Sequence, residues 1–184
     1  MNLYQQKYLK YKTKYELLKK QIGGNPRILR DLKNLQKNPV PGIFVEPVEG
    51  NIFILHGTIT GPSDSPYDGY MWKIRMNIPQ DYPFKPPTVN FVDKIFHPNI
   101  SYTTGAVCVS ILKEEPSGVS RDGGYWNPSL NIGAILLSIQ SLLMDPNTSS
   151  PLNGEASHLL DTNVSAYNEK VKQDAKKYAT VVPQ

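Results

Sequence analysis

The chain has 184 residues and a mass of 20.7 kDa, a length typical of one domain with a short appendage. Hydrophobic residues make up 39% and charged residues 20%, which argues against global disorder and allows a full-sized core. A single cysteine, Cys108, excludes an intramolecular disulfide and a cysteine-rich zinc site, and the three histidines show no metal-ligand spacing. Because the sequence shows neither a bilayer-length apolar run nor a secretory signal, we expect a soluble cytoplasmic protein with no metal and no membrane contact.

The positive charge lies at the N-terminus. Residues 1–24 contain six lysines against one glutamate, a net charge of +5. The other 160 residues carry 14 basic and 15 acidic side chains, a net charge of −1. A nucleic-acid-binding domain would place positive charge on its folded face, so no nucleic-acid partner is expected for the body of the protein.

The first segment reads as an amphipathic helix. Its apolar residues recur at spacings of three and four, and the helix is expected to end at Gly23 and Gly24. The pattern favours a helix that packs on the body or frays in solution. Self-association, a protein partner, and contact with nucleic acid or a membrane surface remain alternatives.

Helix and strand signals follow in order. A helix is predicted from Pro26, a residue favoured at the first helical position, to just before Pro39. Short apolar or alternating runs then predict four strands, at residues 43–46, 52–60, 70–78 and 89–92. Short connections indicate that these strands form an antiparallel meander.

The remainder is a long loop followed by helices. Residues 93–130 are rich in Gly, Pro, Asn and Ser and enclose one apolar run, 106–112; a loop this long is a functional candidate. Helical spacing returns at 131–144 and 164–178. The expected fold is α+β, a four-stranded antiparallel meander flanked by helices, with an extension at 1–24 and a folded unit at 25–184.

Cys108 is the strongest nucleophile among the candidates. A lone cysteine in an apolar run is commonly a small buried hydrophobe, and this alternative stands beside the catalytic one. Gly105 permits close backbone approach, and polar residues 101–104 indicate a surface nearby. A few per cent of a free thiol is ionised at neutral pH, enough to attack a reactive ester without a dedicated base.

Two proline-stiffened motifs precede the cysteine. In His97-Pro98-Asn99, the asparagine amide has donors suited to an oxyanion; alternatively it bonds the backbone of its own turn. In the segment 82–87, Phe84 either folds into the core or is presented to a partner.

A set of motifs in fixed order resembles the ubiquitin-conjugating enzymes from about residue 26 to about residue 180. They are Gly61-Pro62, Ser65-Pro66-Tyr67, Tyr82-Pro83-Phe84-Lys85-Pro86-Pro87, His97-Pro98-Asn99, Cys108, Trp126-Asn127-Pro128, Ile135-Leu136-Leu137-Ser138-Ile139 and Asp145-Pro146-Asn147. The resemblance implies a four-stranded antiparallel sheet flanked by helices, with Cys108 in a shallow groove. On this basis residues 25–184 form the catalytic core.

The resemblance also implies a reaction. A ubiquitin-activating enzyme, which uses ATP upstream, passes the ubiquitin carboxyl group to Cys108 as a thioester. A lysine of a substrate protein then attacks, usually guided by a ligase of RING or HECT type. No cofactor bound to this chain is implied.

Roles for further residues follow from the same resemblance. Asn99 matches the oxyanion or loop-ordering asparagine, with His97 and Pro98 shaping its turn. Ser150 stands at the gate position beside the thiol, and Ser110 where some relatives place aspartate. The remaining matches are partner contacts, namely Arg27 and Arg30 for the activating enzyme and ligase, and Phe84, Pro128 and Ser129 for ligase domains.

Three features depart from the family pattern. Cys108 and Trp126 are 18 residues apart, as in members with an insert that build ubiquitin chains, although the charges here are mixed. Phe44 replaces the small residue through which several relatives bind a second ubiquitin. Residues 1–24 look like extensions of giant-virus proteins, which would place the enzyme in host-cell cytoplasm, with nucleus or virion as alternatives.

Competing functions remain open. A ubiquitin-like modifier of SUMO or NEDD8 type is a close alternative, although the loop at 83–87 favours ubiquitin. An inactive ubiquitin-binding variant is disfavoured because Cys108 and Asn99 are both present. A nucleic-acid binder acting through residues 1–24 would show salt-dependent binding.

Overall fold

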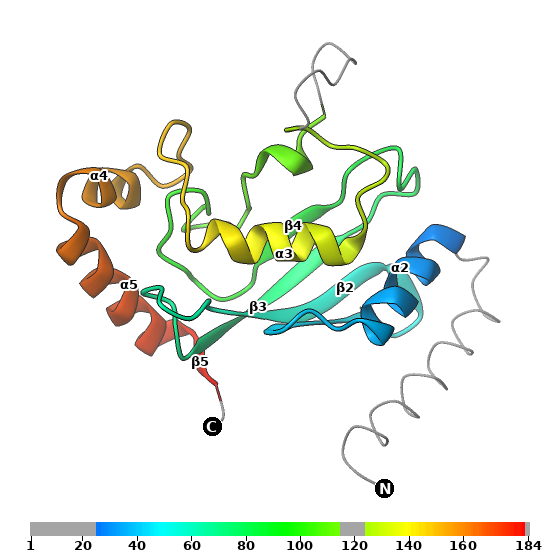
Figure 1. Ribbon diagram of the computed structural model, residues 1–184, viewed down its shortest axis with the longest axis horizontal. Helices are drawn as coiled ribbons and strands as arrows, with labels where there is room; N and C mark the ends of the chain where they lie inside the picture. Colours follow the sequence, from blue (N-terminus) through cyan, green and yellow to red (C-terminus); the bar gives the residue numbers. More distant parts are fainter. Residues whose placement is uncertain (1–24, 115–123, 183–184) are drawn as a thin grey trace, which may run out of the picture.

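The computed structural model describes residues 25–114 and 124–182, and the chain order is helix, four strands, long loop and helices (Figure 1). The α+β prediction is therefore confirmed. The predicted helix in residues 1–22 and most of the segment inserted after Cys108 lie outside the described residues.

Each of the four α-helices in the described part of the chain begins after an asparagine. Asn25 caps α2 (Pro26–Lys37), and its side-chain oxygen accepts a hydrogen bond from the amide of Arg27. The same kind of cap precedes the other three helices, which are α3 (Ile132–Leu142), α4 (Gly154–Thr162) and α5 (Val164–Tyr178). An asparagine cap satisfies an amide that the first helical turn leaves unpaired, so these residues fix where the helices start. Helix α4 was not predicted, because it buries only Ala156 and Ser157.

The sheet is the predicted antiparallel meander with one added strand. Its order is β1-β2-β3-β4, from β1 (Ile43–Val48), β2 (Asn51–Thr60), β3 (Tyr70–Asn77) and β4 (Thr88–Phe91). A short strand near the C-terminus, β5 (Thr180–Val181), pairs with the start of β3 and makes the sheet five-stranded. A strand of only two residues has too little hydrophobic periodicity to be predicted from the sequence.

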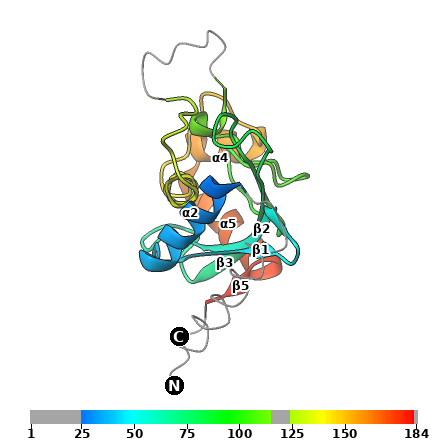
Figure 2. The ribbon, with the colours of Figure 1, turned by 90° about the vertical axis from the view of Figure 1, so that its right-hand side faces the viewer.

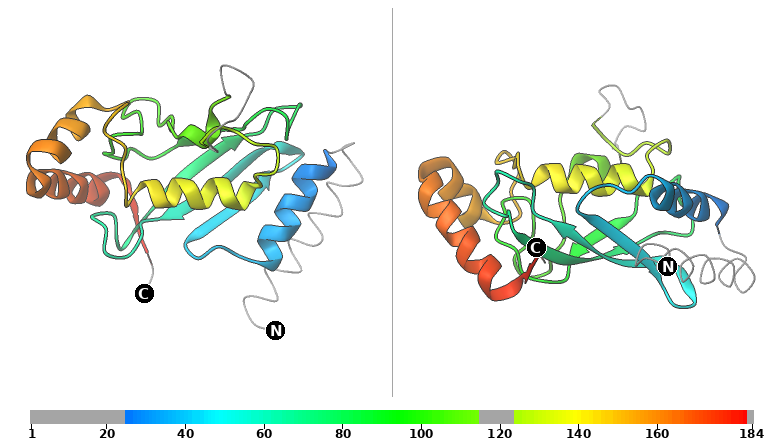
Figure 3. Two further views of the ribbon diagram at one scale, coloured as in Figure 1. Left: turned by 45° about the horizontal axis from the view of Figure 1, so that its top comes forward. Right: turned by 60° about the horizontal axis from the view of Figure 1, so that its bottom comes forward.

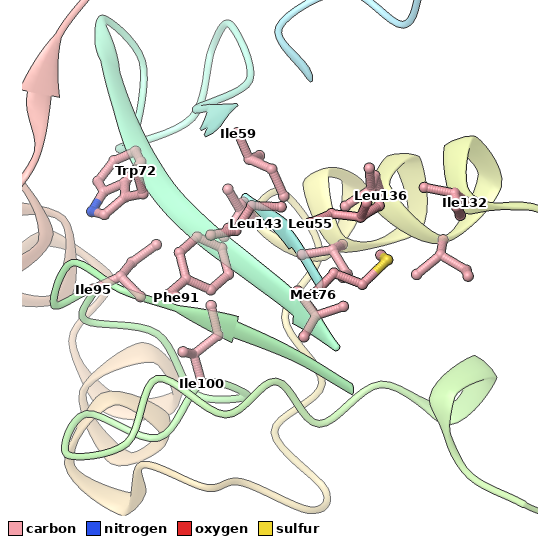
Figure 4. Close-up of a cluster of buried hydrophobic side chains, with 14 of the residues drawn as sticks. Leu55, Ile59, Trp72, Met76, Phe91, Ile95, Ile100, Ile132, Leu136 and Leu143 are labelled. Carbon is pink, nitrogen blue, oxygen red and sulfur yellow. The ribbon is translucent and has the colours of Figure 1, made fainter. Parts of the chain in front are cut away.

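The core lies between the sheet and α3. Figure 4 shows Leu55 and Met76 of the sheet facing Ile132 and Leu136 of α3, and all four are fully buried. Helices α2 and α3 lie on the same side of the sheet (Figure 2), and α4 and α5 lie at the end opposite α2 (Figure 3). In the loop after β4, residues 95–100 are buried, and the following residues 101–114 lie at the surface and include Cys108.

The other face of the sheet is polar along its middle strands. His56, Lys73 and Arg75 are exposed there, as a sheet with one solvated face requires. Phe44 of β1, opposite Thr58, is 43% exposed on this face.

Candidate active site

Cys108 lies on a short segment fastened beside β4. Ala106 and Val107 form isolated bridges with Asn90 and Ile100, and the backbone then turns into a 3-10 helix, Ser110–Leu112. Gly105 has a φ of +69°. Cys108 forms no disulfide and the residue is partly exposed, so the alternative of a buried core cysteine is wrong.

Asn99 connects the cysteine segment to the loop between α3 and α4. Its carbonyl accepts a hydrogen bond from the amide of Cys108 at 2.9 Å. Its buried side chain makes a two-way pair with Asn147, accepting from the backbone amide at 2.8 Å and donating to the carbonyl at 2.6 Å. Asn99 therefore bonds a distant backbone rather than its own turn, which is the loop-ordering geometry.

The amide of Asn99 keeps a second N–H. A carboxamide nitrogen has two hydrogens, and the bond to Asn147 uses one of them. The pairing with Asn147 therefore leaves one donor on a group that the fold holds in a fixed place.

His97 is a structural residue of the turn. Its Nδ1 accepts from the amide of Asn99 and its Nε2 lies 2.9 Å from the carbonyl of Leu142, so the proton must sit on Nε2. Burial lowers the pKa of His97 from 6.5 to about 4, and the side chain is neutral at physiological pH. Both ring nitrogens are committed, so His97 has no lone pair left for a general base.

Pro98 anchors the start of α4. Its carbonyl accepts from the amides of Leu152 and Asn153, at 2.8 and 3.0 Å. Residues 97–99 thus bond successively to the end of α3, the start of α4 and the loop between them. Ser150 lies in that loop between two anchored positions and is exposed.

Ser110 is also exposed, as the first residue of the 3-10 helix that follows Cys108. The fold therefore joins Cys108 to Asn99 by a backbone hydrogen bond, and the Asn99 side chain joins both to the loop of Ser150.

The predicted partner residues form a separate group near the start of α2. Phe84 is 80% exposed, so it is presented to solvent and the core alternative is wrong. Arg30, Pro128 and Ser129 are also exposed. A depression of about 730 Å³ lies between α2 and the loop of Phe84, and Arg30, Phe53 and Pro83 are among the residues that line it.

Arg27 differs from the other predicted partner residues. Its side chain is 15% exposed, and its guanidinium donates to Asp31 and to the carbonyls of Pro128 and Leu130. A group so engaged inside the protein has few donors left for a partner.

Two residues that matter here were given no role from the sequence. Asn147 appeared within a motif, but its pairing with Asn99 spans 48 residues. Asp31 is a 3% exposed acid that lies among the apolar residues of α2. An acidic residue at an apolar position is the sequence signal that could have identified it.

Other kinds of site find no support in the described part of the chain. Residues 25–114 and 124–182 contain no group of three His, Cys, Asp or Glu side chains arranged to hold a metal ion. Over the same residues, no helix combines the length and apolar character needed to cross a membrane.

Comparison with known proteins agrees with this geometry. The family model described as ubiquitin-conjugating enzyme matches residues 27–175. The chain is 43% identical over 145 residues to ubiquitin-conjugating enzyme E2 3 of Arabidopsis thaliana, a match that covers 79% of this chain and 89% of the plant protein. It is 38% identical over 151 residues to ubiquitin-conjugating enzyme E2 2 of Neurospora crassa, covering 82% and 93% of the two chains.

Among solved structures, the E2 domain of a Toxoplasma gondii ubiquitin conjugating enzyme superposes with a TM-score of 0.73 at 36% identity. That match covers 84% of this chain and 98% of the other. Sequence and structure therefore match this family over almost the whole folded body, and Cys108 lies on a partly exposed segment bonded to Asn99. The chain belongs to the ubiquitin-conjugating enzyme family.

Proposed function

We propose that the chain accepts ubiquitin from an activating enzyme as a Cys108 thioester and transfers it to lysines of substrate proteins, usually with a ligase. The observation that carries this proposal is the position of the thiol. Cys108 is free and partly exposed on a segment whose backbone is fixed to Asn99. Family membership supports the same chemistry.

The reaction has two acyl transfers. The sulfur of Cys108 attacks the carbonyl that ubiquitin presents as a thioester of the activating enzyme; a new S–C bond forms and the old one breaks. A lysine amine then attacks the Cys108 thioester, forming an amide, releasing the sulfur and losing a proton to solvent or a nearby base. ATP is consumed by the activating enzyme upstream, so this chain needs no bound cofactor.

Asn99 serves both roles that the family resemblance allows. Its pair with Asn147 orders the loop, and its second N–H is available to the oxyanion that forms when the amine attacks. Ser150 and Ser110 border the site without a charge, so the incoming lysine is deprotonated through desolvation or the ligase rather than by a carboxylate at these positions.

Partners dock at the exposed group near α2. Arg30 and Phe84 line the depression beside α2 and offer a charge and an aromatic anchor. The exposed Pro128 and Ser129 are bonded through their carbonyls to Arg27, which also lines the depression. The activating enzyme and ligases of RING or HECT type are the partners proposed for this surface.

The test is formation of the thioester. Incubation with a ubiquitin-activating enzyme, ATP and ubiquitin is expected to give an adduct that a reducing thiol removes. Cys108→Ser should give an adduct that resists reduction, because an oxygen ester forms, and Cys108→Ala should give none. Charging with SUMO or NEDD8 and their activating enzymes, but not with ubiquitin, would contradict the choice of modifier.

A further inference from the structure

A set of hydrogen bonds joins the start of α2 to two loops that are distant in sequence. Arg27 donates from Nε to Asp31, at 2.9 Å, and from its two terminal nitrogens to the carbonyls of Pro128 and Leu130, each at 2.7 Å. A third carbonyl, that of Ser129, lies 3.4 Å away. One planar guanidinium therefore holds the backbone of the loop at 127–130 against α2.

The second loop is held by the same acid. Tyr82 donates its hydroxyl to Asp31 at 2.6 Å, and both residues are at most 3% exposed. Burial and this hydrogen bond raise the pKa of Tyr82 well above its usual value, so the hydroxyl stays a donor. The indole of Trp126 donates to the carbonyl of Pro83 at 2.9 Å and lies beside the Tyr82 ring.

We call Arg27, Asp31, Tyr82 and Trp126 the brace. Its members come from α2 and from both loops that carry the exposed residues Phe84, Pro128 and Ser129. In the brace the carboxylate of Asp31 accepts hydrogen bonds from both Arg27 and Tyr82, so this one residue links the two loops. Loosening one bond would therefore affect both loops, because charged groups in such a network are not independent.

We propose that the brace positions the two docking loops relative to α2, and that Arg27 acts through it as a positioning residue rather than as a contact for the partner. This inference rests on the proposed function only in naming the partner. A rigid surface does not pay the entropic cost of ordering its loops when the partner binds. A preformed arrangement of the loops therefore increases the affinity for the partner.

The two readings of Arg27 predict different results for interior substitutions. Tyr82→Phe and Asp31→Asn change buried groups and leave the exposed surface as it was. A direct contact by Arg27 would make these changes neutral for the partner and would let Arg27→Lys retain most of the attraction, because the charge is kept. The brace predicts that all three weaken docking, since lysine cannot reproduce the planar fork.

The experiment measures steady-state charging of the full chain by a ubiquitin-activating enzyme preloaded with ubiquitin. For Tyr82→Phe, Asp31→Asn and Arg27→Lys we expect KM for this chain to rise on the order of threefold to tenfold, with a smaller change in kcat. The double variant Tyr82→Phe with Arg27→Lys should raise KM by less than the product of the single effects.

Tyr167→Phe is the matched control, because it removes another buried tyrosine hydroxyl, one that lies 2.7 Å from that of Tyr67. It should lower stability but leave KM within twofold of the parent chain. Equal increases in KM for Tyr82→Phe and Tyr167→Phe would overturn the proposal, as would an unchanged KM for Tyr82→Phe and Asp31→Asn.

A second measurement does not depend on the proposed function. Amide hydrogen exchange in Tyr82→Phe is expected to accelerate together at residues 84–85 and 126–130, on both loops. Acceleration confined to residues 84–85 would overturn the brace even if the parent chain forms no thioester. Absence of charging in the parent chain with coupled exchange intact would overturn the proposed function alone.

Discussion

The Asn99 side chain orders the loop through its pair with Asn147. We propose that it also donates a hydrogen bond to the oxyanion formed at the Cys108 thioester. In a single-turnover assay with preformed thioester and free lysine, Asn99→Ala is expected to slow discharge by about 10²-fold, the usual loss for one oxyanion donor. Charging of Cys108 should be affected much less.

Asn99→Asp separates the two tasks of Asn99. A carboxylate still accepts from the amide of Asn147 but has no N–H to donate. Its discharge should be as slow as that of Asn99→Ala. Normal discharge by the aspartate variant would show that Asn99 orders the loop without touching the reaction.

His97 makes stability depend on pH. Its pKa is about 4 in the folded protein against an ordinary value of 6.5, so unfolding takes up a proton between these values. The contribution to the free energy of unfolding is complete above pH 6.5 and falls with decreasing pH, by about 3 kcal/mol at the acid end of this window. Urea titrations from pH 7 to pH 4 measure the slope.

A substitution isolates His97. His97→Gln should flatten the dependence of the free energy of unfolding on pH, because it removes the buried ring. If His97→Gln does not fold, an NMR titration of the parent chain gives the pKa of His97 directly. A value near 6.5 would contradict a buried neutral ring.

The position of Cys108 depends on how the segment 105–108 packs beside β4. Gly105 has a φ of +69°, and a Cβ there would overlap the carbonyl oxygen of Phe91. We expect Gly105→Ala to lower the free energy of unfolding by more than about 2 kcal/mol, through strain and the clash together. Urea titration measures the loss.

Gly50 offers a matched comparison, because it has a φ of +74° and no atom within 4 Å of the place that an added methyl group would take. Gly50→Ala carries the conformational strain alone and should cost about 1 kcal/mol. Equal losses at the two glycines would contradict the close packing of the Cys108 segment on β4.

At the scale of the whole molecule, local pattern was enough to predict most of the fold. The meander, the helix from Pro26 and the helix near 131–144 follow from periodicity and proline positions that the structure confirms. Helix α4 and strand β5 were missed. One buries only Ala156 and Ser157 and the other has two residues, so tertiary contacts rather than sequence pattern determine them.

The candidate site residues could be chosen from the sequence, but the contacts between them could not. Cys108, Asn99 and Phe84 were chosen from residue chemistry, and the exposure of Cys108 and Phe84 agrees with their predicted roles. The pair of Asn99 with Asn147 and the inward turn of Arg27 depend on contacts across 48 and about 100 residues. A single sequence contains no signal for which distant carbonyl a side chain will reach.

The most direct test of the account is to locate the bond itself. The charged protein is digested without reducing agent, and the branched peptide is identified by mass spectrometry. We expect the carboxyl end of ubiquitin to be joined to the peptide that contains Cys108, and a reducing thiol to release this branch. Ubiquitin attached instead to a lysine of this chain, with Cys108 unmodified throughout the time course, would contradict it.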